Sequence, residues 1–152
     1  MQQITFQIPG RAQQRGSKRP VRNPKTGRIL LIDSNHRSKS WMENVRDHAS
    51  ILWGDRLLLD IPVQLTAQFY FKRPRSHFGT GRNAGKLKSH APMHHGQSPD
   101  LAKLLRSLED GITGAIWMDD KLVSRYGPGT GRYWTTGQER TFVQIDSMAE
   151  VG

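Results

Sequence analysis

The stretch from residue 99 to residue 112, PDLAKLLRSLEDGI, carries the clearest structural signal in this sequence. When it is drawn as a helix, its large apolar side chains gather within about 100° of arc, and polar or charged residues take the remainder. The pattern therefore predicts an amphipathic helix over 99–112 whose apolar side docks on a sheet. The docking residues are Leu101, Leu104, Leu105, Leu108 and Ile112.

The segments around this helix predict the sheet and a second helix. Alternation of apolar and polar residues predicts strands over 3–8, 61–71, 122–126 and 140–145. Turn residues 23–27 (NPKTG) predict a hairpin over 21–33. A helix is predicted from Ser38 or Ser40 to Trp53, with Ser40 and Glu43 forming a capping box. We therefore expect an α+β fold, a single domain over 1–152 in which helices pack on one face of a small mixed β-sheet.

Length and composition exclude several classes of protein. The 152 residues have the size of one domain. The chain has no cysteine, which excludes a disulfide framework and thiol chemistry and fits a reducing compartment, so we expect a cytoplasmic protein. No apolar run approaches about 18 residues, and the first residues (MQQITFQIPG) lack the pattern of a signal peptide, so we expect no membrane partner.

The distribution of charge points to nucleic acid as the partner. Lys and Arg number 23 against 13 Asp and Glu, a formal net charge of +10. Residues 72–90 hold six basic side chains and no acidic one, and the glycine-rich, histidine-rich segment 73–98 is expected to be an exposed, flexible basic loop. The alternative is that these charges only keep the protein soluble. The residues expected to contact DNA phosphates are Arg15, Lys18, Arg19, Arg22, Arg73, Arg75, Arg82, Lys86 and Lys88.

Five of the 13 acidic residues fall between Asp100 and Asp120, against the overall charge. A helix that runs back across a sheet would let Asp100 meet Asp119 and Asp120 at one edge. Carboxylates that meet in this way suit Mg²⁺ and phosphodiester hydrolysis, and Arg106 on the polar side of the helix could hold the scissile phosphate. The alternative is plainer: Asp100 caps the helix, Asp119 and Asp120 make a turn, and Arg106 is solvated.

These residues resemble the RusA family of Holliday junction resolvases. The family pattern is P-D-x-D-N/K-L-x-K/R followed by a paired D-D, and residues 99–106 (PDLAKLLR) with Asp119 and Asp120 match it without a gap. Residues 6–11 and 14–19, the turn at 23–27 and Trp41 resemble the N-terminal strand, basic segment and first helix of phage-type members. The resemblance covers most of the chain apart from 76–98 and the last few residues.

The resemblance implies a homodimeric, Mg²⁺-dependent endonuclease, with Mn²⁺ as a substitute ion, that nicks four-way DNA junctions symmetrically in recombination and repair. It places the protein in the cytoplasm of a bacterial or phage-infected cell and implies no nucleotide cofactor. Position by position, Asp100 and Asp120 would be catalytic metal ligands with Asp119 beside them. Arg106 would stand where the family has a lysine, which changes a point charge into a planar fork.

Ala102 departs from the family pattern, which has an aspartate there. Three explanations remain open: a lineage with fewer ligands, a protein that binds junctions without cutting them, and a change that inactivates this chain. Glu109 is a poor substitute, because seven residues of helix span about 10 Å. Leu122 also departs, since the family often has glutamine there.

Other candidate sites are weaker. Residues 79–86 (GTGRNAGK) resemble a phosphate-binding loop, but Thr80 and Leu87 occupy positions where that motif needs other residues. His90, His94 and His95 do not have the spacing of a closed zinc site. The four tryptophans could stack on unpaired bases, but Trp41, Trp53 and Trp117 sit in apolar patterns and are expected in the core or in a dimer interface. Trp134, between polar residues, is the one to test for stacking. A basic RNA-binding module remains a third possibility, but it leaves the carboxylates without a role.

Overall fold

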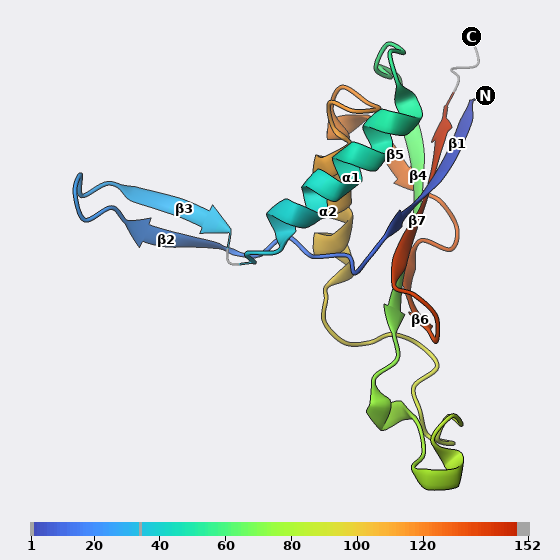
Figure 1. The fold of residues 1–152 in the computed structure, drawn as a ribbon. Helices are drawn as coiled ribbons and strands as arrows, with labels where there is room; N and C mark the ends of the chain where they lie inside the picture. The colour runs from blue at the N-terminus through green and yellow to red at the C-terminus, as the bar shows by residue number, and fades with distance from the viewer. Residues whose placement is uncertain (1, 34, 149–152) are drawn as a thin grey trace.

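A five-stranded mixed sheet carries the fold in a computed structural model that describes residues 2–33 and 35–148 (Figure 1). Strand β7 (Arg140–Ser147) lies between β1 (Gln3–Pro9) and β4 (Val63–Lys72) and is antiparallel to both. The other edge of β4 pairs in parallel first with β5 (Val123–Tyr126) and then with β6 (Gly131–Thr135). Strand β4 is buried along most of its length because it has neighbours on both edges.

Helices α1 (Ser38–Trp53) and α2 (Leu101–Ile112) pack on each other and cover one face of this sheet (Figure 1). They approach closely where Gly111 faces Val45: a Cβ atom on Gly111 would lie 2.7 Å from Cγ1 of Val45. The core between helices and sheet includes Trp117, Phe69 and Leu108, which are fully buried. The α+β fold with helices on one face is therefore confirmed.

Two segments project from this body (Figure 1). Strands β2 (Lys18–Arg22) and β3 (Ile29–Asp33) form a separate two-stranded hairpin. The second projection, residues 73–98, contains the short 3-10 helices η1 (Arg75–His77) and η2 (Gly81–Asn83). Its surface is exposed as expected, but its base is fixed by the buried side chains of His77 and His95. Its flexibility stays a prediction.

The sequence predictions of helices and strands are mostly confirmed, with two errors. The capping box at Ser40 is wrong, because α1 begins earlier, at Ser38, and its N-cap residue Arg37 makes no side-chain capping hydrogen bond. Strand β6 was not predicted, since GRYWT follows a glycine-rich turn and is short and polar. Trp41, Trp53 and Trp117 lie in the core as predicted. Neither described α-helix is long and apolar enough to cross a membrane.

Candidate active site

Asp100 is the N-cap residue of α2. Its Oδ1 accepts hydrogen bonds from the backbone N–H groups of Ala102 at 2.9 Å and Lys103 at 3.3 Å. Its own N–H donates to Oε1 of Gln14 at 2.6 Å, and a guanidinium N–H of Arg132 donates to the carbonyl of Pro99 at 3.0 Å. The capping role is therefore confirmed. The residue remains exposed, so capping leaves it accessible to a ligand.

Asp119 and Asp120 follow Trp117, which is fully buried, and Met118, whose N–H donates to the carbonyl of Leu59 at 3.0 Å. Asp119 caps the short 3-10 helix η3 (Asp120–Leu122) by accepting from the N–H of Lys121, and this hydrogen bond lowers the pKa of Asp119. Asp120 is exposed. Desolvation, followed by the neighbouring carboxylates of Asp119 and Asp110, raises the pKa of Asp120. Asp120 therefore interacts with the last turn of α2.

Glu109 belongs to the same region. Its Oε1 accepts a hydrogen bond from the hydroxyl of Tyr126 at 3.0 Å. Burial raises the pKa of Glu109, and repulsion from Asp120 and Asp110 adds to the effect. Burial and the charge of Glu109 raise the pKa of Tyr126 to about 12. Asp120 thus lies near Glu109 and Asp110 at the C-terminal end of α2. Glu109 and Asp110 were not predicted to take part, although the local excess of acidic residues was a signal for them.

The structure does not bring Asp100 together with Asp119 and Asp120 within one chain. Asp100 caps the first turn of α2, whereas Asp120 interacts with Glu109 and Asp110 in the last turns, and ten residues of helix span about 15 Å. The chain leaves α2, is held beside Leu59, and enters η3 and β5, where Val123 pairs with Val63 at the start of β4. Arg132, which donates to the carbonyl of Pro99 beside Asp100, pairs with Phe69 farther along β4. The predicted meeting of all three carboxylates at one edge is therefore not found.

The separation of Asp100 from Asp119 and Asp120 bears on whether these residues can bind one metal ion together. No group of three or more His, Asp or Glu side chains within 2–33 and 35–148 lies close enough to hold one. Asp119 and Asp120 are adjacent, and oxygen ligands suit Mg²⁺. A three-carboxylate site made of Asp100, Asp119 and Asp120 does not fit a single chain.

Arg106 and Ala102 lie on the exposed side of α2, four residues apart and so one above the other. Burial raises the pKa of Glu109, and the positive charge of Arg106 has a smaller, opposite effect that lowers it. The side chain of Ala102 is an exposed methyl group that offers no ligand atom, while its N–H is held by Asp100. The polar face of α2 is thus accessible between its two acidic ends.

The residues predicted to contact DNA fall into two classes. Two of them have structural partners: Arg15 forms an ion pair with Asp110 at 3.4 Å, and Arg73 donates to the carbonyl of Pro92 at 2.7 Å. The others are exposed on the two projections. The hairpin carries Lys18, Arg19 and Arg22, and the 73–98 projection carries Arg75, Arg82, Lys86 and Lys88.

Trp134, the candidate for stacking on unpaired bases, packs against other rings of the chain. Its side chain is half-buried on β6, with its ring centroid 4.2 Å from that of His95 and 4.9 Å from that of His77. These rings join the base of the 73–98 projection to the sheet. His95 is buried, and desolvation together with the positive charges of Arg132 and Arg11 lowers its pKa. Trp134 therefore has a packing role.

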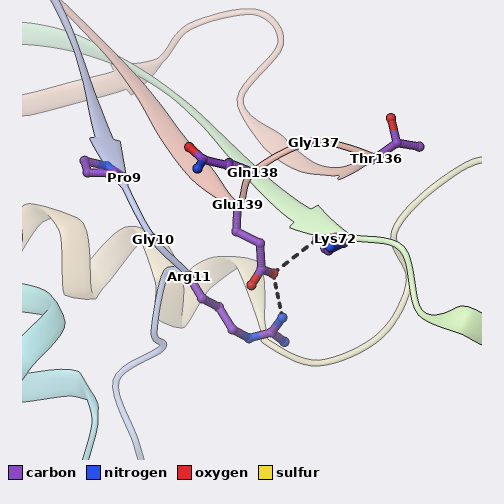
Figure 2. Close-up of a pocket in the computed structure, with 8 residues that line it drawn as sticks. All are labelled: Pro9, Gly10, Arg11, Lys72, Thr136, Gly137, Gln138 and Glu139. Carbon is purple, nitrogen blue, oxygen red and sulfur yellow. Dashed lines mark hydrogen bonds and ion pairs between the residues drawn. The ribbon is translucent and has the colours of Figure 1, made fainter.

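Arg11 was not predicted as a site residue and lines three pockets, two of which are also lined by residues just before Asp100. The largest has a volume of about 570 Å³ and lies where β1, β4 and β7 meet (Figure 2). Glu139 points into it, accepting from the guanidinium of Arg11 at 2.8 Å and from the backbone N–H of Lys72 at 3.1 Å (Figure 2). A second pocket, of about 220 Å³, is lined by Arg11, Ser98 and Pro99, directly before the cap of α2. Arg11 is thus paired with Glu139 and also lines the pocket directly before Asp100.

Comparison with models of protein families matches residues 9–146 to the family described as Endodeoxyribonuclease RusA. The matched range runs from the end of β1 into β7 and includes both acidic ends of α2. A search of curated proteins gives no match.

Proposed function

Because the chain belongs to the RusA family of endodeoxyribonucleases, we propose that it resolves four-way DNA junctions by hydrolysing phosphodiester bonds. The family match over residues 9–146 carries this proposal, and DNA is the substrate class that the family implies. The exposed position of Asp100 at the start of α2 supports it, since a capping role alone does not require that the carboxylate be accessible. Residues 1–152 would form one nuclease domain.

We propose Asp100, Asp120 and Arg106 as the catalytic residues, with Asp119 as a further metal ligand. Arg106 is exposed and permanently charged, so it can hold a phosphate or stabilise the negative charge that develops on it. Mg²⁺ is the expected ion, with Mn²⁺ as a substitute. Within one chain Asp100 lies apart from Asp119 and Asp120, so the described residues of a single chain do not form a three-carboxylate site for the ion. We therefore describe no step of bond cleavage at the ion.

Recognition of the junction would depend on shape. Exposed basic side chains on two separate projections can contact phosphates on different arms, and such contacts carry no base information. A homodimer would present these surfaces twice around a two-fold axis, matching the symmetry of the substrate. We propose this dimer as the form that acts in recombination and repair in the cytoplasm of a bacterial or phage-infected cell.

Ala102 favours a second candidate, a junction-binding protein that does not cut. The methyl group lies exposed on the first turn of α2, beside the carboxylate that caps it, so a ligand oxygen is missing from an accessible position. Both candidates share the basic surface and predict salt-sensitive binding to a junction over duplex DNA.

Nicking of a labelled four-way junction in Mg²⁺ and in Mn²⁺ separates the two. The native chain, Ala102→Asp and Asp100→Asn are compared, and Asp100→Asn keeps the capping oxygen as the matched control. If the native chain nicks the junction and Asp100→Asn does not, the proposal of a nuclease is supported. Nicking by Ala102→Asp alone supports an inactivated member of the family. If neither the native chain nor Ala102→Asp cuts but both prefer the junction, the binding protein is supported, and absence of that preference as well would contradict both candidates.

A further inference from the structure

The β2–β3 hairpin exposes a row of aliphatic side chains that nothing in the described part of the chain covers. Ile29, Leu30 and Leu31 are 68, 56 and 66% exposed, and Val21 and Ile32 are each 37% exposed. The hairpin pairs only with itself and extends away from the body (Figure 1). Isolated two-stranded hairpins are marginally stable in water, and aliphatic residues on both faces need cover. We call residues 18–32 the arm.

Other exposed apolar side chains lie on the last turns of α1 and on the segments beyond it. Ile51 and Leu57 are 85 and 92% exposed, Ile61 is 43% exposed, and Met118 is 56% exposed. Met118 and Ile61 belong to neighbouring segments, because the N–H of Met118 donates to the carbonyl of Leu59 and residues 59 and 117 form a bridge. We call Ile51, Leu57, Ile61 and Met118 the α1-end patch.

The two surfaces are complementary in charge. The arm carries Lys18, Arg19, Arg22, Lys25 and Arg28, and the one acidic residue of the hairpin is Asp33, which ends β3 opposite Lys18. Exposed Asp55 and Asp60 lie beside the α1-end patch, with Arg56 stacked over Trp53 at 4.5 Å. Pairing two arms with each other would bring ten cations together. Contact between the arm and the α1-end patch instead brings opposite charges together around apolar side chains, and this arrangement favours association.

The fold keeps these two surfaces apart within one chain. The arm leads directly into the start of α1, and the patch follows the end of the same helix, which is 16 residues and therefore about 24 Å long. The arm also points away from that end (Figure 1). A second copy related by a two-fold axis would bring the arm of each chain to the patch of the other, forming two equivalent contacts.

We propose that the arm docks on the α1-end patch of a second copy of this chain, so that two chains exchange arms. The proposal rests on the dimer of the proposed function and names its contact surface; it does not depend on catalysis.

The test measures the mass of the native chain and its variants in solution by analytical ultracentrifugation over a range of concentrations, without DNA. An arm variant, Ile29→Ser with Leu31→Ser, and a patch variant, Ile51→Ser with Leu57→Ser, change only exposed side chains, so folding is expected to persist and is checked by circular dichroism. Met93→Ser, at an 83% exposed residue of the 73–98 projection, is the matched control. Each double substitution is expected to raise the dissociation constant of the dimer by about tenfold or more, whereas the control variant is expected to leave it unchanged.

Mixing the arm variant with the patch variant makes the test specific. The intact arm of one chain then meets the intact patch of the other, so the mixture is expected to dimerise more strongly than either variant alone. A dimer weakened by the arm variant and not by the patch variant would show arm-to-arm pairing and overturn the proposal. A dimer unaffected by both would overturn the arm contact and leave the proposed dimer standing, and a monomeric native chain would contradict both. Loss of junction binding by the arm variant with an unchanged dimer would assign the arm to DNA instead.

Discussion

Asp100 serves the stability of α2 and the proposed chemistry through the same carboxylate, and these two roles can be separated. Replacing it with alanine removes the oxygen that accepts from the N–H groups of Ala102 and Lys103. Loss of such a cap costs about 1 kcal/mol. Asparagine keeps an acceptor oxygen, and its cost is expected to be a few tenths of a kcal/mol.

These energies convert into a measurable shift. For a domain of about 150 residues, 1 kcal/mol lowers the melting temperature by about 2–4 °C. Asp100→Ala is therefore expected to melt about 3 °C below the native chain, and Asp100→Asn close to it. Thermal and urea unfolding followed by circular dichroism measure both. Asp47→Ala, which removes an exposed carboxylate from the middle of α1, is the control and is expected to have no destabilising effect.

Equal destabilisation by alanine and asparagine, or none by alanine, would refute the capping argument. If asparagine preserves stability and abolishes nicking, the lost activity comes from the charge of the carboxylate, because the helix it caps is intact.

Helix packing, the partly buried carboxylate of Glu109 and the basic projection each give a further prediction. Gly111→Ala is expected to destabilise the protein by about 1–3 kcal/mol, because its Cβ would lie 2.7 Å from Cγ1 and 2.8 Å from Cβ of Val45. Urea unfolding measures this loss, and an unchanged midpoint would contradict the packing argument. Burial raises the pKa of Glu109, so the stabilising contribution of its protonated form is present at low pH and is lost as pH rises through the raised pKa. Glu109→Gln should therefore be more stable than the native chain at about pH 7 and no more stable at about pH 3. Equal differences in stability at the two pH values would contradict this. Replacing three exposed cations of the 73–98 projection, Arg82, Lys86 and Lys88, with alanine should weaken binding to the junction. The slope of the logarithm of the binding constant against the logarithm of salt concentration should fall by about 0.9 for each phosphate that is no longer neutralised. Arg125→Ala is the control and should change neither.

The sequence was most informative where one physical requirement dominates. Helix α2 was predicted because an amphipathic helix against a sheet needs apolar residues at a fixed period. Capping by Asp100 was the alternative to a metal site, because Asp100 stands directly before that period begins. The hairpin was predicted because its turn needs particular residues. Strand β6 was missed because its pairing with β4 comes from tertiary contacts that five polar and aromatic residues do not reveal.

The placement of the carboxylates was harder to predict. Spacing along the chain gives the length of α2 but not the direction in which the chain leaves it. The contacts between Met118 and Leu59 fix that direction, and they place Asp119 and Asp120 at the end of α2 opposite Asp100. Arg15 was likewise predicted as a DNA contact, but its position beside Asp110 depends on the packing of the segment before the hairpin against α2.

The order of strands in the sheet has a consequence for how this chain is made. β7, the last strand to leave the ribosome, occupies the position between β1, the first, and β4. Until residues 140–147 are available, β1 has no partner strand and one edge of β4 is open. The hairpin, formed from local contacts, can fold early, whereas the main sheet must wait for nearly the whole chain. Truncation before β7 would therefore divide the sheet in two and leave exposed strand edges, which are prone to aggregation.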